Sequence, residues 1–255
     1  MISKIIISKS IDDAIVKCGQ RLTLNSKVTS VLDKFAKETI NRKTEKGLLI
    51  NDNGEIVHSK NGSKHKVEIW KGIDYRGLYE EHGALHVEHN HPSTIKDFDY
   101  TECLSDDDML NVISKVKQAD GRGGLWEEYL VKSITAEGTN GSRMTLVRGD
   151  NYSDDDEKLF QEARRELSES YDDYVHNKYS NKYNAIRDGL INESREKYGN
   201  DETLRRLGEL DKEASKRAIK ELGIFEKSDN FKKIQKKFRD ANCKLIVESG
   251  NYVWW

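Results

Sequence analysis

A single proline, Pro92, occurs among the 255 residues, and it stands directly after two histidines in the string His89-Asn90-His91-Pro92. A chain of this length would carry about a dozen prolines at average usage. Residues 83–88, which come just before, have the small and apolar content of a short strand. Because Pro92 lacks a backbone N–H donor, it predicts the end of that strand at His91. Alternate side chains of a strand point to the same face, so we expect His89 and His91 to project side by side.

Two neighbouring imidazoles match two ligands of a tetrahedral zinc site, which in an enzyme has three protein ligands and one water. We expect the third ligand at a helix start downstream, where Ser105 is the predicted N-cap of an acidic first turn. The apolar residues that follow keep helical spacing: Met109, Leu110, Val112, Ile113 and Val116. Asp108 is the preferred ligand, and Asp107 and Glu102 are the alternatives. The simpler interpretation is that these aspartates only cap a helix and complement its dipole.

Together with Glu45 upstream, these residues resemble the signature of the JAB/JAMM (MPN-like) zinc metallopeptidases. That signature is a glutamate, then His-x-His-Pro, then Ser-x-x-Asp. The similarity covers residues 26–150. The spelling His-Asn-His-Pro-Ser is closer to bacterial and phage members, including JAB-like domains of polymorphic toxins, than to eukaryotic deubiquitinases.

One spacing departs from the family pattern. Sixteen residues separate His91 from Asp108, which is a longer gap than the family usually has. An insertion over residues 94–103 accounts for the excess if Ser105 and Asp108 are the true Ser-x-x-Asp pair. Counting the usual spacing strictly points to Glu102 instead.

The resemblance implies a zinc-dependent hydrolase that cleaves peptide or isopeptide bonds. His89, His91 and Asp108 would hold the zinc, which lowers the pKa of its bound water to about 7. Glu45 would act as general base and pass the proton to the leaving amine, and Ser105 would donate a hydrogen bond to the developing oxyanion. The implied partner is a protein or peptide substrate, including a ubiquitin-like conjugate. On sequence alone, Glu45 is equally a solvated residue between a helix and a strand.

Two other functional classes compete with a hydrolase. A phage or mobile-element structural or interaction protein could keep the same fold, and the metal, without hydrolysis. The letters His-Asn-His suggest an HNH nuclease, but that motif is spread over a whole ββα unit rather than three adjacent residues. The net charge of −2 also argues against a nucleic-acid partner, and the basic residues within 227–239 are expected to form a solvated helix face.

Hydrophobic patterning predicts a compact α+β fold followed by a mainly α-helical C-terminal region. The resemblance implies that the first part is a JAB/MPN-like mixed sheet flanked by helices, and that the helical region recruits a partner or covers the cleft. We expect two parts, at residues 1–150 and 151–255. A helix is predicted over residues 26–43. The other strands are predicted near the N-terminus, at 47–51, 54–58 and 65–70, and in a hairpin of 128–135 with 143–148 around Asn140-Gly141.

We expect a cytoplasmic protein of a bacterial or phage-infected cell. The N-terminus lacks a signal-peptide pattern, no segment is long and apolar enough to cross a membrane, and the three cysteines are scattered. A toxin exported by a specialised route, or a protein packaged in a virion, would share these features. The terminal Tyr252-Val253-Trp254-Trp255 is expected to dock on the body of the protein, because exposed aromatics would leave a sticky patch.

Overall fold

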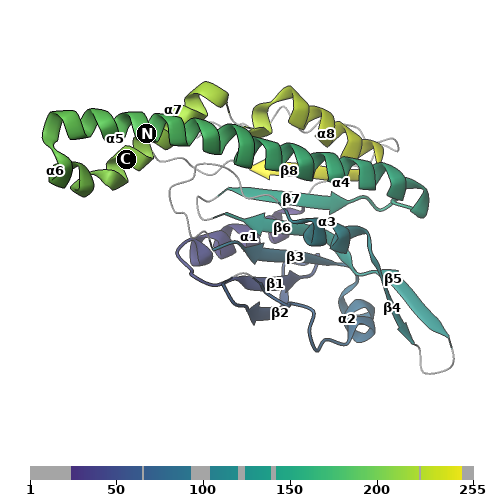
Figure 1. The fold of residues 1–255 in the computed structure, drawn as a ribbon. Coiled ribbons are helices and arrows are strands. Elements are labelled where there is room, and N and C mark those ends of the chain that lie inside the picture. Colours follow the sequence, from purple (N-terminus) through teal and green to yellow (C-terminus); the bar gives the residue numbers. More distant parts are fainter. Residues whose placement is uncertain are drawn as a thin grey trace, which may run out of the picture.

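The centre of the molecule is a six-stranded mixed β-sheet (Figure 1). The computed structural model describes residues 24–64, 66–92, 104–119, 124–138, 142–223 and 225–248. The strands lie in the order β2-β1-β3-β6-β7-β8, and neighbours are antiparallel except for the parallel pair β3 and β6. Their bounds are Lys46–Ile50 for β1, Ile56–Asn61 for β2, Leu85–Asn90 for β3, Val131–Glu137 for β6, Arg143–Arg148 for β7 and Cys243–Glu248 for β8. A separate antiparallel pair consists of β4 (Lys115–Ala119) and β5 (Leu125–Tyr129).

The remaining regular secondary structure of the described chain is helical. Those that precede the last sheet hairpin are α1 (Ser26–Thr39), α2 (Tyr75–His82) and α3 (Asp106–Ile113). Those that follow it are α4 (Glu157–Asp172), α5 (Ser180–Tyr198), α6 (Asn200–Arg205), α7 (Leu207–Leu222) and α8 (Asp229–Asp240). A π-helical segment, Asp173–Tyr179, joins α4 to α5, and short 3₁₀ turns lie at Asp154–Asp156 and Phe225–Lys227.

The helices cover both faces of the sheet. The adjacent residues Leu48 and Leu49 point to opposite faces because strand side chains alternate. Leu48 packs against α1 together with Ile50, whereas Leu49 belongs to the main core on the other face. The helices of that second face are α3, α4 and α8, and they contribute Met109, Val112, Ile113, Phe160, Ala163, Leu167, Phe231, Ile234 and Phe238. The predicted α+β class, with a mixed sheet flanked by helices and a mainly helical C-terminal region, is therefore confirmed.

The C-terminal region is joined to the sheet rather than separate from its core. Residues from both sides of position 150 share the main hydrophobic cluster, and β8 pairs with β7 as the last strand of the sheet. The division at residue 150 stays a prediction. Beyond the sheet, α5 packs along α7, and both helices extend past the strands with α6 at their far end (Figure 1). None of the described helices has the length and apolar character of a membrane span.

The tyrosines of the C-terminal region pack between helices. Tyr179 is fully buried and shares a hydrogen bond of 2.8 Å with the Ser215 hydroxyl of α7. The Tyr174 hydroxyl donates to the Gly223 carbonyl at 2.6 Å. These contacts identify Tyr174 and Tyr179 as residues that pack between helices.

Several predicted elements differ from the structure. The predicted strand at 65–70 is wrong: the described residues 66–72 form no strand. The chain turns here because Ser63 N–H donates to the Lys66 carbonyl at 2.8 Å, and a Cβ on Gly62 would clash with the same carbonyl oxygen. The first helix ends at Thr39, and α3 ends at Ile113, so that Val116 lies in β4 and not in the predicted helix. The sequence did not indicate α2, β4 or β8. The predicted N-terminal strand, the Asn140-Gly141 turn and the terminal aromatic residues lie outside the described residues.

A polar network on the α1 face of β3 leads to a stability prediction. His86 is buried between Ser133, whose Oγ lies 2.7 Å from Nδ1, and Asp52, whose Oδ1 lies 2.9 Å from Nε2. The hydrogen bond from His86 outweighs the effect of burial and, with Lys132, lowers the pKa of Asp52 to about 2.

Replacing Asp52 by asparagine is expected to lower the free energy of unfolding at pH 7 by about 1 kcal/mol, since Asp52 is half exposed and solvent screens the interaction. A carboxyl with a lowered pKa stabilises the fold above its ordinary pKa, so this difference should disappear as the pH falls from about 4 to about 2. Urea denaturation of both proteins across that range measures it. A difference that stays constant with pH would contradict the assignment.

Candidate metal centre

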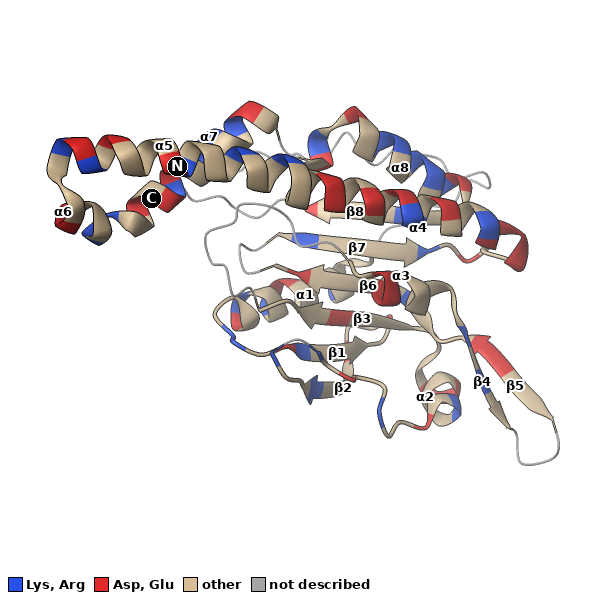
Figure 2. Cartoon of the chain, in the orientation of Figure 1, with Lys and Arg blue, Asp and Glu red and all other residues tan. Residues whose placement is uncertain are grey.

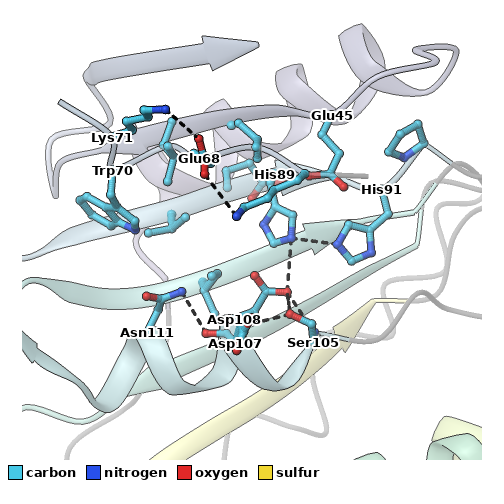
Figure 3. Close-up of a pocket in the computed structure, with 18 of the residues that line it drawn as sticks. Glu45, Glu68, Trp70, Lys71, His89, His91, Ser105, Asp107, Asp108 and Asn111 are labelled. Carbon is cyan, nitrogen blue, oxygen red and sulfur yellow. Dashed lines mark hydrogen bonds and ion pairs between the residues drawn. The ribbon is translucent and has the colours of Figure 1, made fainter. Parts of the chain in front are cut away.

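Strand β3 presents the two histidines at its C-terminal end. His89 lies opposite Gly47 of β1 and Ala136 of β6, so it is held from both sides within the sheet. His91 follows the strand, and its N–H donates to the Glu137 carbonyl at 2.9 Å. The extended backbone brings the two Nε2 atoms to 2.9 Å from each other, with His89 buried and His91 half-buried (Figure 3). The structure thus confirms that the two histidines share a face.

Helix α3 brings Asp108 to the same point. Its first turn is acidic (Figure 2), and Ser105 is its N-cap in a complete capping box. The Asp108 N–H donates to Ser105 Oγ at 3.1 Å, while Asp108 Oδ2 accepts from the Ser105 N–H at 2.9 Å and from its hydroxyl at 2.6 Å. The same Oδ2 lies 3.5 Å from His89 Nε2. The capping box therefore orients the carboxylate that faces the histidines.

The three aspartates of this turn are not equivalent. Asp106 points away from the histidines, since its carboxylate pairs with Arg164 at 2.9 Å and accepts from Ser168 at 2.7 Å. Asp107 is exposed and lines the same cleft as His89, but it is outside the cluster of ligand atoms. The structure therefore favours Asp108 over Asp107 as the carboxylate nearest to the histidines. The third alternative, Glu102, lies outside the described residues.

The side chains of His89, His91 and Asp108 converge as a metal site requires. Each offers one ligand atom, and these atoms all lie within 4.8 Å of one another. If both histidines are neutral and carry their proton on Nδ1, the two Nε2 atoms and the Asp108 carboxylate oxygen all present lone pairs. These lone pairs repel one another unless a proton or a cation lies between them. At Zn–N distances of about 2.0–2.1 Å, two tetrahedral ligand atoms lie about 3.4 Å apart. The distances from His89 Nε2 to His91 Nε2 and to Asp108 Oδ2, 2.9 Å and 3.5 Å, are close to that value. The donor set thus fits zinc.

The electrostatics of Asp108 also suit a cation. Burial alone would raise the pKa of its carboxyl. Electrostatic attraction and a hydrogen bond from His89, together with the hydrogen bonds from Ser105, outweigh that effect and hold the pKa of Asp108 well below its usual range. Asp108 is therefore ionised at neutral pH and ready to act as a metal ligand.

Glu45 lies at the edge of the same site, immediately before β1. Its N–H donates to the Ser63 carbonyl at 2.7 Å, and its carbonyl accepts from Gly62 N–H at 2.8 Å. The side chain is 9 % exposed and points towards His89 and His91 in Figure 3. Among the described residues, none donates a hydrogen bond to this carboxylate. Glu45 is thus a free acceptor beside the candidate metal ligands.

These residues line one cleft of about 780 Å³. Its floor is apolar and includes Val87 and Ile134 of the sheet. One wall is α3, and the other is the segment that follows Gly62. Gly47 allows that segment to approach the sheet, because a Cβ there would lie 3.1 Å from Ile69 and 3.3 Å from Val67. The cleft leaves room for a substrate next to the three converging ligand atoms.

Sequence reasoning missed Asn90, which ties Glu45 to the histidine strand. Its Oδ1 accepts the Lys46 N–H at 2.7 Å, and its Nδ2 donates to the Thr44 carbonyl at 3.3 Å. The side chain thus bonds to the residues on both sides of Glu45. The signal was present in the alternation of the strand, since a residue between two histidines that share one face must point to the opposite face.

For the hydrolase that the sequence predicts, replacing Asn90 by alanine should lower kcat for cleavage by about 10–100-fold, because Glu45 loses its fixed position. Zinc content should stay at the wild-type value, since the three converging ligand atoms are untouched. Metal analysis and steady-state kinetics of the same preparation measure both quantities. Equal losses of zinc and activity would contradict this positioning role.

The sequence also did not indicate a buried charged cluster on the other face of the sheet, opposite the histidines. Glu88 and Glu137 lie beneath the site, next to Arg143, whose Nε is 3.0 Å from Glu137 Oε1 and whose Nη2 donates to Asp33 at 2.8 Å. Burial raises the pKa of Glu88 well above its ordinary value and, against the opposing charge of Arg143, raises that of Glu137 to about 7. The pair therefore holds on to a proton at neutral pH, which limits the negative charge that Arg143 must balance.

The structure brings together five residues that the sequence singled out: Glu45, His89, His91, Ser105 and Asp108. The other described histidines do not join them; His86, for example, belongs to the network with Asp52. A scan against protein-family models, a search of curated proteins and a search of solved structures each found no match. Membership of the JAB/JAMM family therefore stays a prediction.

Proposed function

We propose that this chain is a zinc-dependent hydrolase of the JAB/JAMM type that cleaves peptide or isopeptide bonds. The observation that carries the proposal is the convergence of His89, His91 and Asp108 beside the Glu45 carboxylate in one cleft. A cluster of three ligands leaves a fourth tetrahedral position for water, as catalytic zinc sites do. A nearby carboxylate that accepts no hydrogen bond from the described residues is the group that such a site needs as general base.

Each residue of the proposed site has a separate role. His89, His91 and Asp108 would hold zinc, which supplies an acidic water and polarises the scissile carbonyl. Glu45 takes a proton from water and returns it to the leaving amine, a role that suits a buried carboxylate with no hydrogen-bond donor in the described part of the chain. Ser105 keeps Asp108 in place through its hydroxyl. Donation from Ser105 to an oxyanion, as the resemblance implies, would require that hydroxyl to exchange partners.

The substrate must reach a cleft bordered by the segment after Gly62 and by α3. A flexible peptide or an isopeptide-linked tail fits such a space, whereas a folded domain does not enter 780 Å³. The helical C-terminal region would then be the part that recruits a protein partner, because α5, α6 and α7 extend beyond the sheet.

The test is metal analysis of the purified full chain, followed by cleavage assays on quenched-fluorescence peptides and ubiquitin-like conjugates. We expect one zinc per chain, loss of cleavage on chelation, and recovery when zinc is added back. Failure to bind zinc at micromolar concentration would overturn the proposal. Stoichiometric zinc without cleavage of any substrate would favour the alternative of a non-catalytic structural or interaction protein.

A further inference from the structure

The cleft has one strongly basic wall. Among its described residues, the segment 62–71 carries three lysines, Lys64, Lys66 and Lys71, against one acidic residue, Glu68, and all four line the cleft. The whole chain, by contrast, carries a net charge of −2. The excess of positive charge is thus local to this wall.

Lys66 and Lys71 both form ion pairs with Glu68, whose single negative charge does not neutralise both lysines. Lys66 Nζ lies 3.2 Å from Glu68 Oε1, and Lys71 Nζ lies 3.5 Å from Glu68 Oε2. One carboxylate therefore bridges two ammonium groups. Because the lysine side chains are 70 % and 74 % exposed, their remaining N–H donors are open to a ligand.

The basic wall is off to one side of the candidate metal centre. Figure 3 shows Trp70 and Lys71 on one side of His89, and Glu45 and His91 on the other. Trp70 is half-buried in the cleft wall, and the apolar side chains Val67 and Ile69 lie beside it. A peptide bound across the metal centre would therefore meet lysines and an aromatic ring on only one side of its scissile bond.

We infer that the cleft selects peptides with an acidic residue on one side of the scissile bond, held by Lys66 and Lys71. This inference rests on the proposed function, whose substrate class it narrows. Glu68 supplies one negative charge against the two ammonium groups, so a substrate carboxylate that reaches their solvent-facing N–H donors gains charge-assisted hydrogen bonds. A basic patch beside a cleft also raises the rate at which anionic ligands arrive. Asp107 on the opposite wall disfavours a second acidic residue near α3.

Binding is measured with the zinc-loaded Glu45→Gln chain, so that the peptides stay intact. Fluorescent peptides of equal length carry glutamate, glutamine or lysine at successive positions on either side of a common centre. We expect the glutamate peptides to bind about tenfold more tightly than the glutamine peptides on one side only, with a preference that weakens in high salt. Equal affinity for all peptides, or the same preference on both sides, would overturn the inference.

Two double variants with the same charge change test whether Lys66 and Lys71 cause the acidic preference. Lys66→Glu together with Lys71→Glu should abolish the acidic preference or reverse it. Lys158→Glu with Lys212→Glu, an equal charge change at exposed positions that do not line the cleft, should leave the preference intact. Zinc content and circular dichroism show that each variant is folded. Equal losses in the two variants would assign the preference to net charge and overturn the proposed site.

Two further outcomes separate this inference from the proposed function. Cleavage by the wild-type chain without any acidic preference in KM would refute the inference and keep the hydrolase. Selective binding of acidic peptides without cleavage would keep the inference as a binding site and count against the hydrolase. A single-stranded oligonucleotide that binds the cleft more tightly than the acidic peptide would overturn the choice of a peptide ligand.

Discussion

Replacing Glu45 by glutamine should lower kcat for peptide cleavage by about 10²–10⁴-fold and leave the zinc content unchanged. The Glu45 carboxylate points towards the histidines and has no hydrogen-bond donor among the described residues. Glutamine keeps the shape and the backbone contacts to Gly62 and Ser63, but it cannot accept a proton. Inductively coupled plasma analysis and single-turnover kinetics on one preparation separate the metal from the chemistry.

Glu193→Gln on α5 is the matched control, because it makes the same chemical change at an exposed position away from the cleft. It should retain wild-type kcat and KM. A Glu45→Gln protein with near wild-type turnover would show that another group transfers the proton. Loss of zinc in Glu45→Gln would instead place Glu45 among the metal ligands.

Local signals in the sequence predicted the part of the fold that builds the site. The histidine strand ends at Asn90, one residue before the predicted end at His91, and Ser105 with Asp108 forms the predicted helix start. Each of these features is decided by neighbouring residues. The strand predicted at 65–70 failed because Val67 and Ile69 are apolar for a different reason: they cover Gly47 in the cleft wall. Alternating apolar residues do not distinguish a strand from a loop that packs on a sheet.

Features that depend on long-range pairing could not be predicted in the same way. β8 joins the sheet beside β7 across almost a hundred residues of chain, and Arg143 meets Asp33 across 110 positions. Asn90 acts on a segment 44 residues away through the Lys46 N–H. Such contacts can be predicted only when the strand order is known, because arginine, aspartate and asparagine also occur commonly on solvent-exposed surfaces.

The metal assignment itself is tested most directly at Asp108. Asparagine at this position keeps an oxygen that can accept from the Ser105 N–H and hydroxyl, so the capping box and α3 should survive. It lacks the negative charge that the cation requires. We therefore expect Asp108→Asn to weaken zinc binding by at least about 100-fold and to remove activity.

The neighbouring Asp106→Asn is the control, because it loses the same charge in the same turn but faces Arg164 and Ser168 instead of the histidines. It should bind zinc like the wild type, which excludes a general effect of the acidic turn. His89→Ala should behave like Asp108→Asn. A ligand that binds only the folded chain stabilises it by about 4 kcal/mol when its concentration is a thousand times Kd. Zinc should therefore raise the Tm of the wild type and of Asp106→Asn. A similar rise in Asp108→Asn and His89→Ala would place the metal elsewhere, since neither variant retains the three converging ligand atoms.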